Sequence, residues 1–228
     1  MYLSIEEKAS FDENGYILLK NVIPIDDIDE LMDCFAEIVI ADMSLKNETE
    51  LKKLDPLQEG LIELKKNFPH CSPWIYSAIN NSLSYKRFIY NLPIDNYVCG
   101  LMGIDGKKMI GTSISSFRFD VPGHTEILRD WHQDINYVPD SVFSLVSWLP
   151  LNNVTKENGA VIMCPKSHMN GEYETTFQPS EQYKSEQYVV PEEIAFQYSK
   201  VVLEAEKGDI AFFHMHMLHR SGENISDN

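Results

Sequence analysis

The stretch DIAFFHMHMLHRS, residues 209–221, is the last of six short segments that have the composition of β-strands. All six follow Lys107, are enriched in β-branched and aromatic residues, and are separated by Gly, Pro and Asn, a pattern typical of strands joined by turns. The other five are MIGTSISSFRFDV (109–121), DWHQDINYV (130–138), FSLVSWLPL (143–151), AVIMCP (160–165) and YSKVVLEA (198–205). A mainly β core is therefore predicted for residues 107–228.

Residues 1–106 are predicted to be mostly helical. Ser4 and Glu7 form a capping-box pattern that opens a short helix to about Asn14. Apolar residues then recur every three or four positions from Asp26 to about Met43, as in an amphipathic helix. The remaining predictions are a strand at 15–23, an exposed helical hairpin or loop at 47–67, and a helix at 72–91 that opens with Ser-Pro. Helices followed by strands predict an α+β fold, here a β-sandwich or jelly roll with helices on its outside.

Composition and charge argue against several classes of protein. The chain has 228 residues, of which 43% are hydrophobic, so it can form the core of one large domain. A formal net charge of −16 argues against nucleic acid partners and, less strongly, against anionic substrates and membranes. The sequence shows no apolar run long enough to cross a bilayer and no secretory signal. The four cysteines, Cys34, Cys71, Cys99 and Cys164, lack CxxC spacing and indicate reduced thiols of a cytoplasmic protein.

The segment WHQDINY, residues 131–137, contains the first candidate metal ligands. His132 and Asp134 would share one face of a strand and could reach one ion, although such a triplet is also expected by chance. A third ligand could come from His214, His216 or His219. In a continuous strand, His214 and His216 share a face and His219 takes the other. Two histidines and one carboxylate with open positions are typical of non-haem Fe(II) oxygenases, whereas a lone histidine is more often an ordinary hydrogen-bonded side chain.

The order of several motifs resembles the phytanoyl-CoA dioxygenase (PhyH) family of Fe(II)/2-oxoglutarate-dependent oxygenases. The matching pieces are WHQD (131–134), WLPLNNVTKENGAVIMCPKSH (148–168), KGDIAFFHMHMLHRSGENIS (207–226) and, near the N-terminus, FDENGYILLKNVIPIDDIDEL (11–31). The resemblance covers nearly the whole chain, apart from residues 44–107. It implies one oxygenase domain over 1–228, with a double-stranded β-helix (a cupin-like jelly roll) and flanking N-terminal helices.

The resemblance also implies roles for individual residues. His132, Asp134 and His219 match the iron ligands of the family, and Ser221 matches a hydroxyl that contacts 2-oxoglutarate. Residues FRFDVPG (117–123) resemble a strand with further cosubstrate contacts, so Arg118 and Asp120 are candidate cofactor-binding residues, with a surface ion pair as the alternative. His168 matches a family histidine outside the metal triad.

One departure concerns the arginine that holds the 2-oxoglutarate carboxylate in the family. It lies a short distance beyond the distal histidine, whereas this sequence stops at Asn228. Because a buried carboxylate without a cation is costly, we expect a final strand to follow Asn228. The alternatives are that Arg118, Arg129 or Arg220 substitutes, or that the protein does not bind 2-oxoglutarate.

The function implied is hydroxylation of a small-molecule metabolite with Fe(II), 2-oxoglutarate and O2, releasing succinate and CO2. Related halogenases have a small residue where this chain has Asp134, so the carboxylate implies oxygen insertion. The substrate is expected to enter under the 168–190 loop. Two alternatives remain: a non-catalytic jelly-roll binding or sensor protein, and a cupin-like enzyme that uses another divalent metal.

Overall fold

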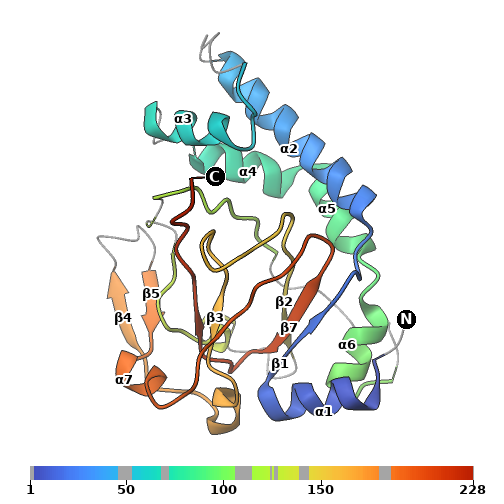
Figure 1. Cartoon of the computed structure of the whole chain (residues 1–228), viewed down its shortest axis with the longest axis vertical. Helices are drawn as coiled ribbons and strands as arrows, with labels where there is room; N and C mark the ends of the chain where they lie inside the picture. The colour runs from blue at the N-terminus through green and yellow to red at the C-terminus, as the bar shows by residue number, and fades with distance from the viewer. Residues whose placement is uncertain are drawn as a thin grey trace.

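The computed structural model describes residues 3–45, 53–67, 72–105, 115–123, 125, 128–138, 144–179 and 186–227. Most helices lie above and to the right of a central pair of small antiparallel sheets, and the strands of the first sheet lie side by side in the middle of the molecule (Figure 1). This arrangement is the expected α+β jelly roll with flanking helices, so the predicted fold class is confirmed.

The first sheet joins strands from both ends of the chain. Its order is β1 (Tyr16–Leu19), β7 (Ile210–His214) and β2 (Leu145–Trp148), all antiparallel. The second sheet has the order β6 (Val201–Val202), β3 (Ile162–Met163) and β8 (His219–Arg220). The cluster between the sheets takes residues from both, including Met163 and Leu203 on one side and Ala211 and Phe213 on the other.

The outer face of the first sheet is covered by helices. α1 (Ile5–Asn14) and α6 (Asp95–Met102) contribute Phe11, Tyr97 and Leu101 to a cluster that also holds Ile17 and Phe212 from the sheet. Strand alternation explains why Phe212 joins this cluster while Ala211 and Phe213 join the cluster between the sheets, because neighbouring residues of β7 face opposite layers. The capping box predicted at Ser4 and Glu7 is present.

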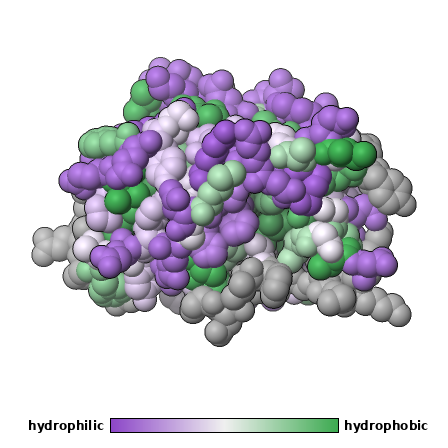
Figure 2. All heavy atoms as spheres, turned by 90° about the horizontal axis from the view of Figure 1, so that it is seen from below, coloured by the Kyte–Doolittle hydropathy of each residue, from purple (hydrophilic) through white to green (hydrophobic). Residues whose placement is uncertain are grey.

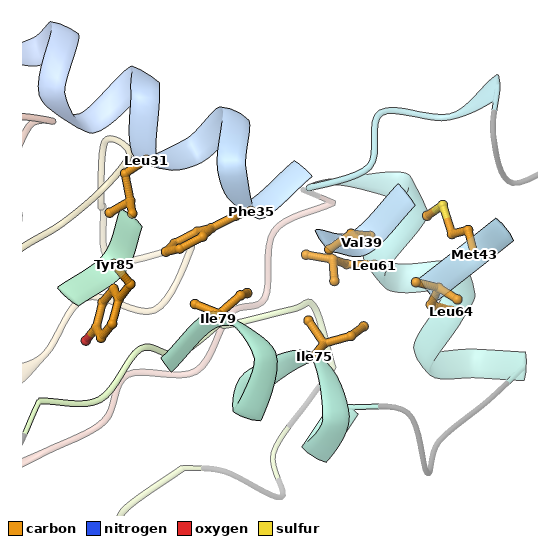
Figure 3. Close-up of a cluster of buried hydrophobic side chains, with 9 residues drawn as sticks. All are labelled: Leu31, Phe35, Val39, Met43, Leu61, Leu64, Ile75, Ile79 and Tyr85. Carbon is orange, nitrogen blue, oxygen red and sulfur yellow. The ribbon is translucent and has the colours of Figure 1, made fainter. Parts of the chain in front are cut away.

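A second helical layer packs around α2 (Ile25–Leu45), which follows the predicted amphipathic helix closely. Its buried residues Phe35 and Val39 contact α3 (Glu59–Asn67), α4 (Ser72–Asn81) and α5 (Leu83–Asn91), as Figure 3 shows. The helix predicted over 72–91 is thus two helices. They separate at Ser82, whose hydroxyl accepts a hydrogen bond from the Tyr85 amide and caps the second helix.

Three predicted strands differ from the structure. Residues 115–121 have no regular strand, while 109–114 lie outside the described residues. Segment 130–138 has only an isolated bridge at His132, followed by the 3-10 turn η4 (Asp134–Asn136). The segment 209–221 contains two strands, β7 and β8, because the chain turns between His214 and His219.

The polar stretch after η5 (Ser167–Asn170) was expected to be a lid-like loop, but part of it is a hairpin. Strands β4 (Thr176–Pro179) and β5 (Glu186–Val189) pair in register from Thr176–Val189 to Pro179–Glu186, and α7 (Glu192–Ala195) follows. Residues 180–185 lie outside the described chain. The hairpin carries aromatic residues on its surface, including Phe177 and Tyr188.

The molecular surface is mainly hydrophilic on the face seen in Figure 2, with hydrophobic side chains in small groups among polar ones. This agrees with the acidic composition. Among the described helices, none combines the length and apolar character required to span a membrane. Cys34, Cys99 and Cys164 are free thiols, whereas Cys71 lies outside the described residues.

Candidate metal centre

The backbone holds His132 and His219 side by side. The His132 amide donates to the His219 carbonyl (3.0 Å), and the His219 amide donates to the His132 carbonyl (3.1 Å). This reciprocal pair brings the two rings to a centroid separation of 4.2 Å. Both side chains are buried, and the ring of His219 also contacts Phe213 in the cluster between the sheets. The position of the two imidazoles is therefore set by main-chain pairing within the jelly roll.

Asp134 completes the group from the first residue of η4. One carboxylate oxygen is 3.6 Å from His132 Nε2 and the other is 3.7 Å from His219 Nε2. The three predicted ligands offer atoms that all lie within 4.8 Å of one another. The spacing of His132 and Asp134 was predicted from strand alternation. In the structure, however, the bend into η4 carries the carboxylate to the imidazoles.

Hydrogen bonds determine which ring nitrogen faces the centre. His132 Nδ1 contacts the Asp130 carbonyl at 2.6 Å, and His219 Nδ1 contacts the Met217 carbonyl at 2.9 Å. A carbonyl can only accept, so each Nδ1 carries the proton and each Nε2 keeps its lone pair. Such outer hydrogen bonds fix the tautomer and orientation of metal-binding histidines. The donor set therefore fits a divalent metal such as Fe(II).

Charges around the centre favour the protonation states that metals bind. Burial acts to raise the pKa of Asp134, but His219, His132 and Arg129 together lower this pKa to about 2. Burial, with help from His132, lowers the pKa of His219 to about 4. The centre thus holds a carboxylate and a neutral imidazole near neutral pH, which are the forms that coordinate a metal.

The three predicted cofactor-binding residues also lie together. Arg118 Nη1 donates to Ser221 Oγ at 3.0 Å, and the same guanidinium pairs with the carboxylate of Asp120 at 2.9 Å. The Arg129 amide donates a further hydrogen bond to Ser221 Oγ at 3.0 Å. Burial raises the pKa of Asp120, against the opposing effect of Arg118. This cluster adjoins the metal centre through the short link from His219 to Ser221.

Three further histidines among the described residues form a separate group. His168 and His214 have ring centroids 5.4 Å apart, and His214 stacks on His216 at 5.1 Å. His168 Nε2 contacts the Asp12 carbonyl at 3.2 Å. Of the three histidines near the C-terminus, only His219 joins the cluster of potential metal ligands within the described chain.

Sequence reasoning missed Gln133, which is fully buried between the two predicted ligands. Its amide nitrogen donates to the carbonyls of Gly171 (2.8 Å) and His216 (2.7 Å), and its oxygen accepts from the Tyr173 amide (2.8 Å). Gln187 of the hairpin is buried as well, and it binds the backbone at Leu128 and Asp130. The sequence gives no signal for either role, because glutamine is usually a surface residue.

A jelly roll that encloses two histidines and a carboxylate defines a class of cupin-fold proteins with a non-haem metal centre. The chain belongs to the phytanoyl-CoA dioxygenase (PhyH) family, whose family model matches residues 11–228.

Curated relatives agree with this membership. The chain is 22% identical over 247 residues to the peroxisomal phytanoyl-CoA dioxygenase of Homo sapiens, and this match covers 97% of the chain and 64% of the relative. It is 24% identical over 258 residues to phytanoyl-CoA dioxygenase 1 of Oryza sativa subsp. japonica, with 98% and 85% coverage. The chain thus spans slightly less than two thirds of the human enzyme.

Solved structures share the fold. The non-heme alpha ketoglutarate dependent carbocyclase SnoK from nogalamycin biosynthesis matches with a TM-score of 0.60 and 14% identity, over 99% of this chain and 80% of SnoK. EctD from S. alaskensis, solved with 2-oxoglutarate and 5-hydroxyectoine, matches with a TM-score of 0.57 and 19% identity, over 98% and 72%. At these identities the likeness defines the jelly-roll fold.

Proposed function

We propose that this protein is an Fe(II)/2-oxoglutarate-dependent dioxygenase that hydroxylates a small molecule and releases succinate and CO2. One observation carries the proposal: two buried Nε2 atoms and a carboxylate converge, and both Nδ1 atoms are bound to backbone carbonyls. Membership of the PhyH family supports the same reaction.

In this proposal His132, Asp134 and His219 would hold Fe(II) through two imidazole nitrogens and a carboxylate oxygen. Iron with bound 2-oxoglutarate supplies the activation of O2. The protein's own task is to keep the imidazoles neutral, the carboxylate ionised and the donors fixed in direction. The reciprocal backbone bonds between His132 and His219 support that rigidity.

Ser221 and Arg118 are proposed to bind the carboxylate of 2-oxoglutarate that points away from the metal. A hydroxyl and a guanidinium at 3.0 Å from each other offer a charge-assisted hydrogen-bonding pair for such a group. Asp120 would orient Arg118 through their ion pair. A cation at this place offsets the cost of burying the carboxylate.

The proposed substrate is a small molecule, and the proposed compartment is the cytoplasm. Reduced cysteines support the compartment, since Cys34, Cys99 and Cys164 are all free. The carboxylate of Asp134 occupies the position that halogenases leave small, which supports hydroxylation.

The direct test is conversion of 2-oxoglutarate to succinate by protein supplied with Fe(II), ascorbate and O2. We expect slow turnover by the wild-type chain and none by Asp134→Ala or His219→Ala, with folding checked by circular dichroism. His216→Ala is the matched control and should keep the wild-type rate. Absence of metal-dependent 2-oxoglutarate binding by calorimetry would contradict the proposal. Loss of turnover in His216→Ala but not in His219→Ala would overturn the ligand assignment.

A further inference from the structure

A row of aromatic rings leads from the metal centre to the surface. The ring of His132 contacts Tyr137 (5.9 Å between centroids), Tyr137 contacts Tyr188 (5.4 Å), and Tyr188 contacts Phe177 (5.5 Å). Exposure rises along the row, from 4% for His132 to 36% for Tyr188 and 50% for Phe177. Tyr188 and Phe177 belong to the β4–β5 hairpin. The aromatic row therefore connects the predicted ligand His132 to the exposed surface of this hairpin.

Arg129 places a positive charge beside this row. Its guanidinium lies 4.6 Å from the centre of the Tyr137 ring. The Nη1 atom is buried and has no hydrogen-bond partner in the described parts of the chain, where no ion pair of Arg129 with a carboxylate is found either. The backbone is fixed, because the Arg129 carbonyl accepts from the Ser221 amide at 2.9 Å.

A partly buried guanidinium whose buried Nη1 has no partner among the described residues is unusual in a chain with a net charge of −16. Burying a cation without a partner is costly, and a bound anion would offset this cost. Arg118 differs, because its guanidinium already has partners in Asp120 and Ser221 and is assigned to the cosubstrate above. Arg129 is also close to the metal centre, because the Tyr137 ring that it contacts lies against the ring of His132. Its charge is therefore available to a ligand located between the metal and the hairpin.

We propose that Arg129 binds a carboxylate of the substrate, and that the apolar remainder of this substrate lies along Tyr137, Tyr188 and Phe177. The inference rests on the proposed oxygenase function and specifies its substrate class as an apolar carboxylic acid. One guanidinium matches one carboxylate through two parallel hydrogen bonds. The aromatic rings supply contact area for an apolar chain or ring.

2-Oxoglutarate also carries carboxylates that Arg129 could bind. The test must therefore distinguish a substrate carboxylate from a cosubstrate carboxylate. The protein is loaded with Mn²⁺ and 2-oxoglutarate, and two acids, 4-phenylbutyrate and octanoate, are compared with their uncharged amides. Binding is measured by ligand-observed NMR, in which Mn²⁺ broadens the signals of a probe held near the metal. Affinities for Mn²⁺ and 2-oxoglutarate are measured separately by calorimetry.

We expect at least one acid to bind the wild-type protein about tenfold more tightly than its amide. Arg129→Gln should abolish this preference while 2-oxoglutarate affinity stays within about threefold of the wild-type value. Arg129→Lys, which keeps the charge without the planar guanidinium, should retain part of the preference. Tyr188→Ala should weaken acid and amide alike.

Arg220→Gln is the matched control. Arg220 also lies over an aromatic ring, that of Trp131 at 5.1 Å, and has a buried Nε without a partner in the described chain. However, it packs against Trp131 and near Cys164, and strand alternation puts its side chain on the face of β8 opposite that of His219. This variant should keep the acid preference.

Two results would overturn the inference. The first is that wild-type protein that binds Mn²⁺ and 2-oxoglutarate binds acids and amides equally, or binds neither. The second is that Arg129→Gln loses affinity for 2-oxoglutarate and keeps its preference for acids. The second result would assign the cation to the cosubstrate. Failure of the wild-type protein to bind Mn²⁺ and 2-oxoglutarate would instead contradict the proposed oxygenase function.

Discussion

Gln133 separates the predicted ligands His132 and Asp134 in sequence, and its side chain binds three backbone groups from other segments. Replacing it by alanine leaves buried donors and acceptors without partners. We expect Gln133→Ala to lower the free energy of unfolding by about 2–4 kcal/mol, measured by urea denaturation of the metal-free protein. Gln197→Ala, at an exposed position, should change it by less than about 0.5 kcal/mol. Equal effects of the two substitutions would contradict the structural role of Gln133.

Gly15 ends α1 in a left-handed conformation (φ 80°), next to the side chain of His168. A methyl group at this position would overlap the His168 ring and approach Met217 Cε to 2.6 Å. Gly103 also has a positive φ (64°), but a methyl group there meets open space. Gly15→Ala should therefore be about 1–3 kcal/mol more destabilising than Gly103→Ala. Denaturation of both variants under the same conditions measures the difference, and equal losses would show that backbone strain alone is responsible.

At the scale of residues, the sequence predicted which three side chains come together but not the geometry that joins them. His219 was distinguished from His214 and His216 by its motif, and only His219 lies in the cluster. The sequence predicted that Asp134 faces the same ion as His132 because both would lie on one face of a strand. This reason was wrong, since the segment bends into η4 at Asp134 instead of continuing as a strand. The contacts that fix these residues come from distant segments, which local spacing does not encode.

At the scale of elements, the group of His168, His214 and His216 links the end of α1 to η5 and the end of β7. Burial, followed by the charges of His216 and His168, lowers the pKa of His214 from its ordinary value of 6.5 to about 4. The unfolded chain then binds more protons than the folded one, so stability decreases as pH falls below 6.5.

This linkage should reduce the free energy of unfolding by about 1–2 kcal/mol between about pH 6.5 and 5. The titratable groups facing His214 are the other two histidines, and burial also lowers the pKa of His168. His214→Asn, which retains an acceptor for the His216 amide, should make the pH profile less steep, while His219 continues to contribute to the slope. Urea denaturation of metal-free protein at several pH values tests this, and an unchanged slope would exclude His214 as the source.

Local signals explain which elements could be predicted. The capping box at Ser4 and the periodicity of α2 lie within single segments, and both helices were predicted correctly. The turn between β7 and β8 was missed because MHML (215–218) contains no Gly, Pro or Asn. It forms instead through the Ile135 amide, which donates to the Met215 carbonyl at 3.2 Å, and the Met217 amide, which donates to His214 at 2.8 Å.

At the scale of the whole molecule, metal binding should stabilise the fold, because the donors converge only in the folded chain. Mn²⁺ at about one hundred times its dissociation constant should raise Tm by roughly 5–10 °C, since mass action then contributes about 2.7 kcal/mol. A chelator should reverse the rise, and Asp134→Ala should remove it, whereas His216→Ala should preserve it. Differential scanning fluorimetry measures these shifts, and an equal rise in Asp134→Ala would place the metal elsewhere.

The reciprocal backbone pairing of His132 with His219 has a consequence for biosynthesis. A nascent chain on the ribosome exposes His132 and Asp134 long before His219 emerges from the exit tunnel. Until then, the metal meets only two of its three donors and the partner strand that aligns them is missing. Loading of iron is therefore expected only after residue 219 has been translated, so that the cell's labile iron pool meets all three donors at once.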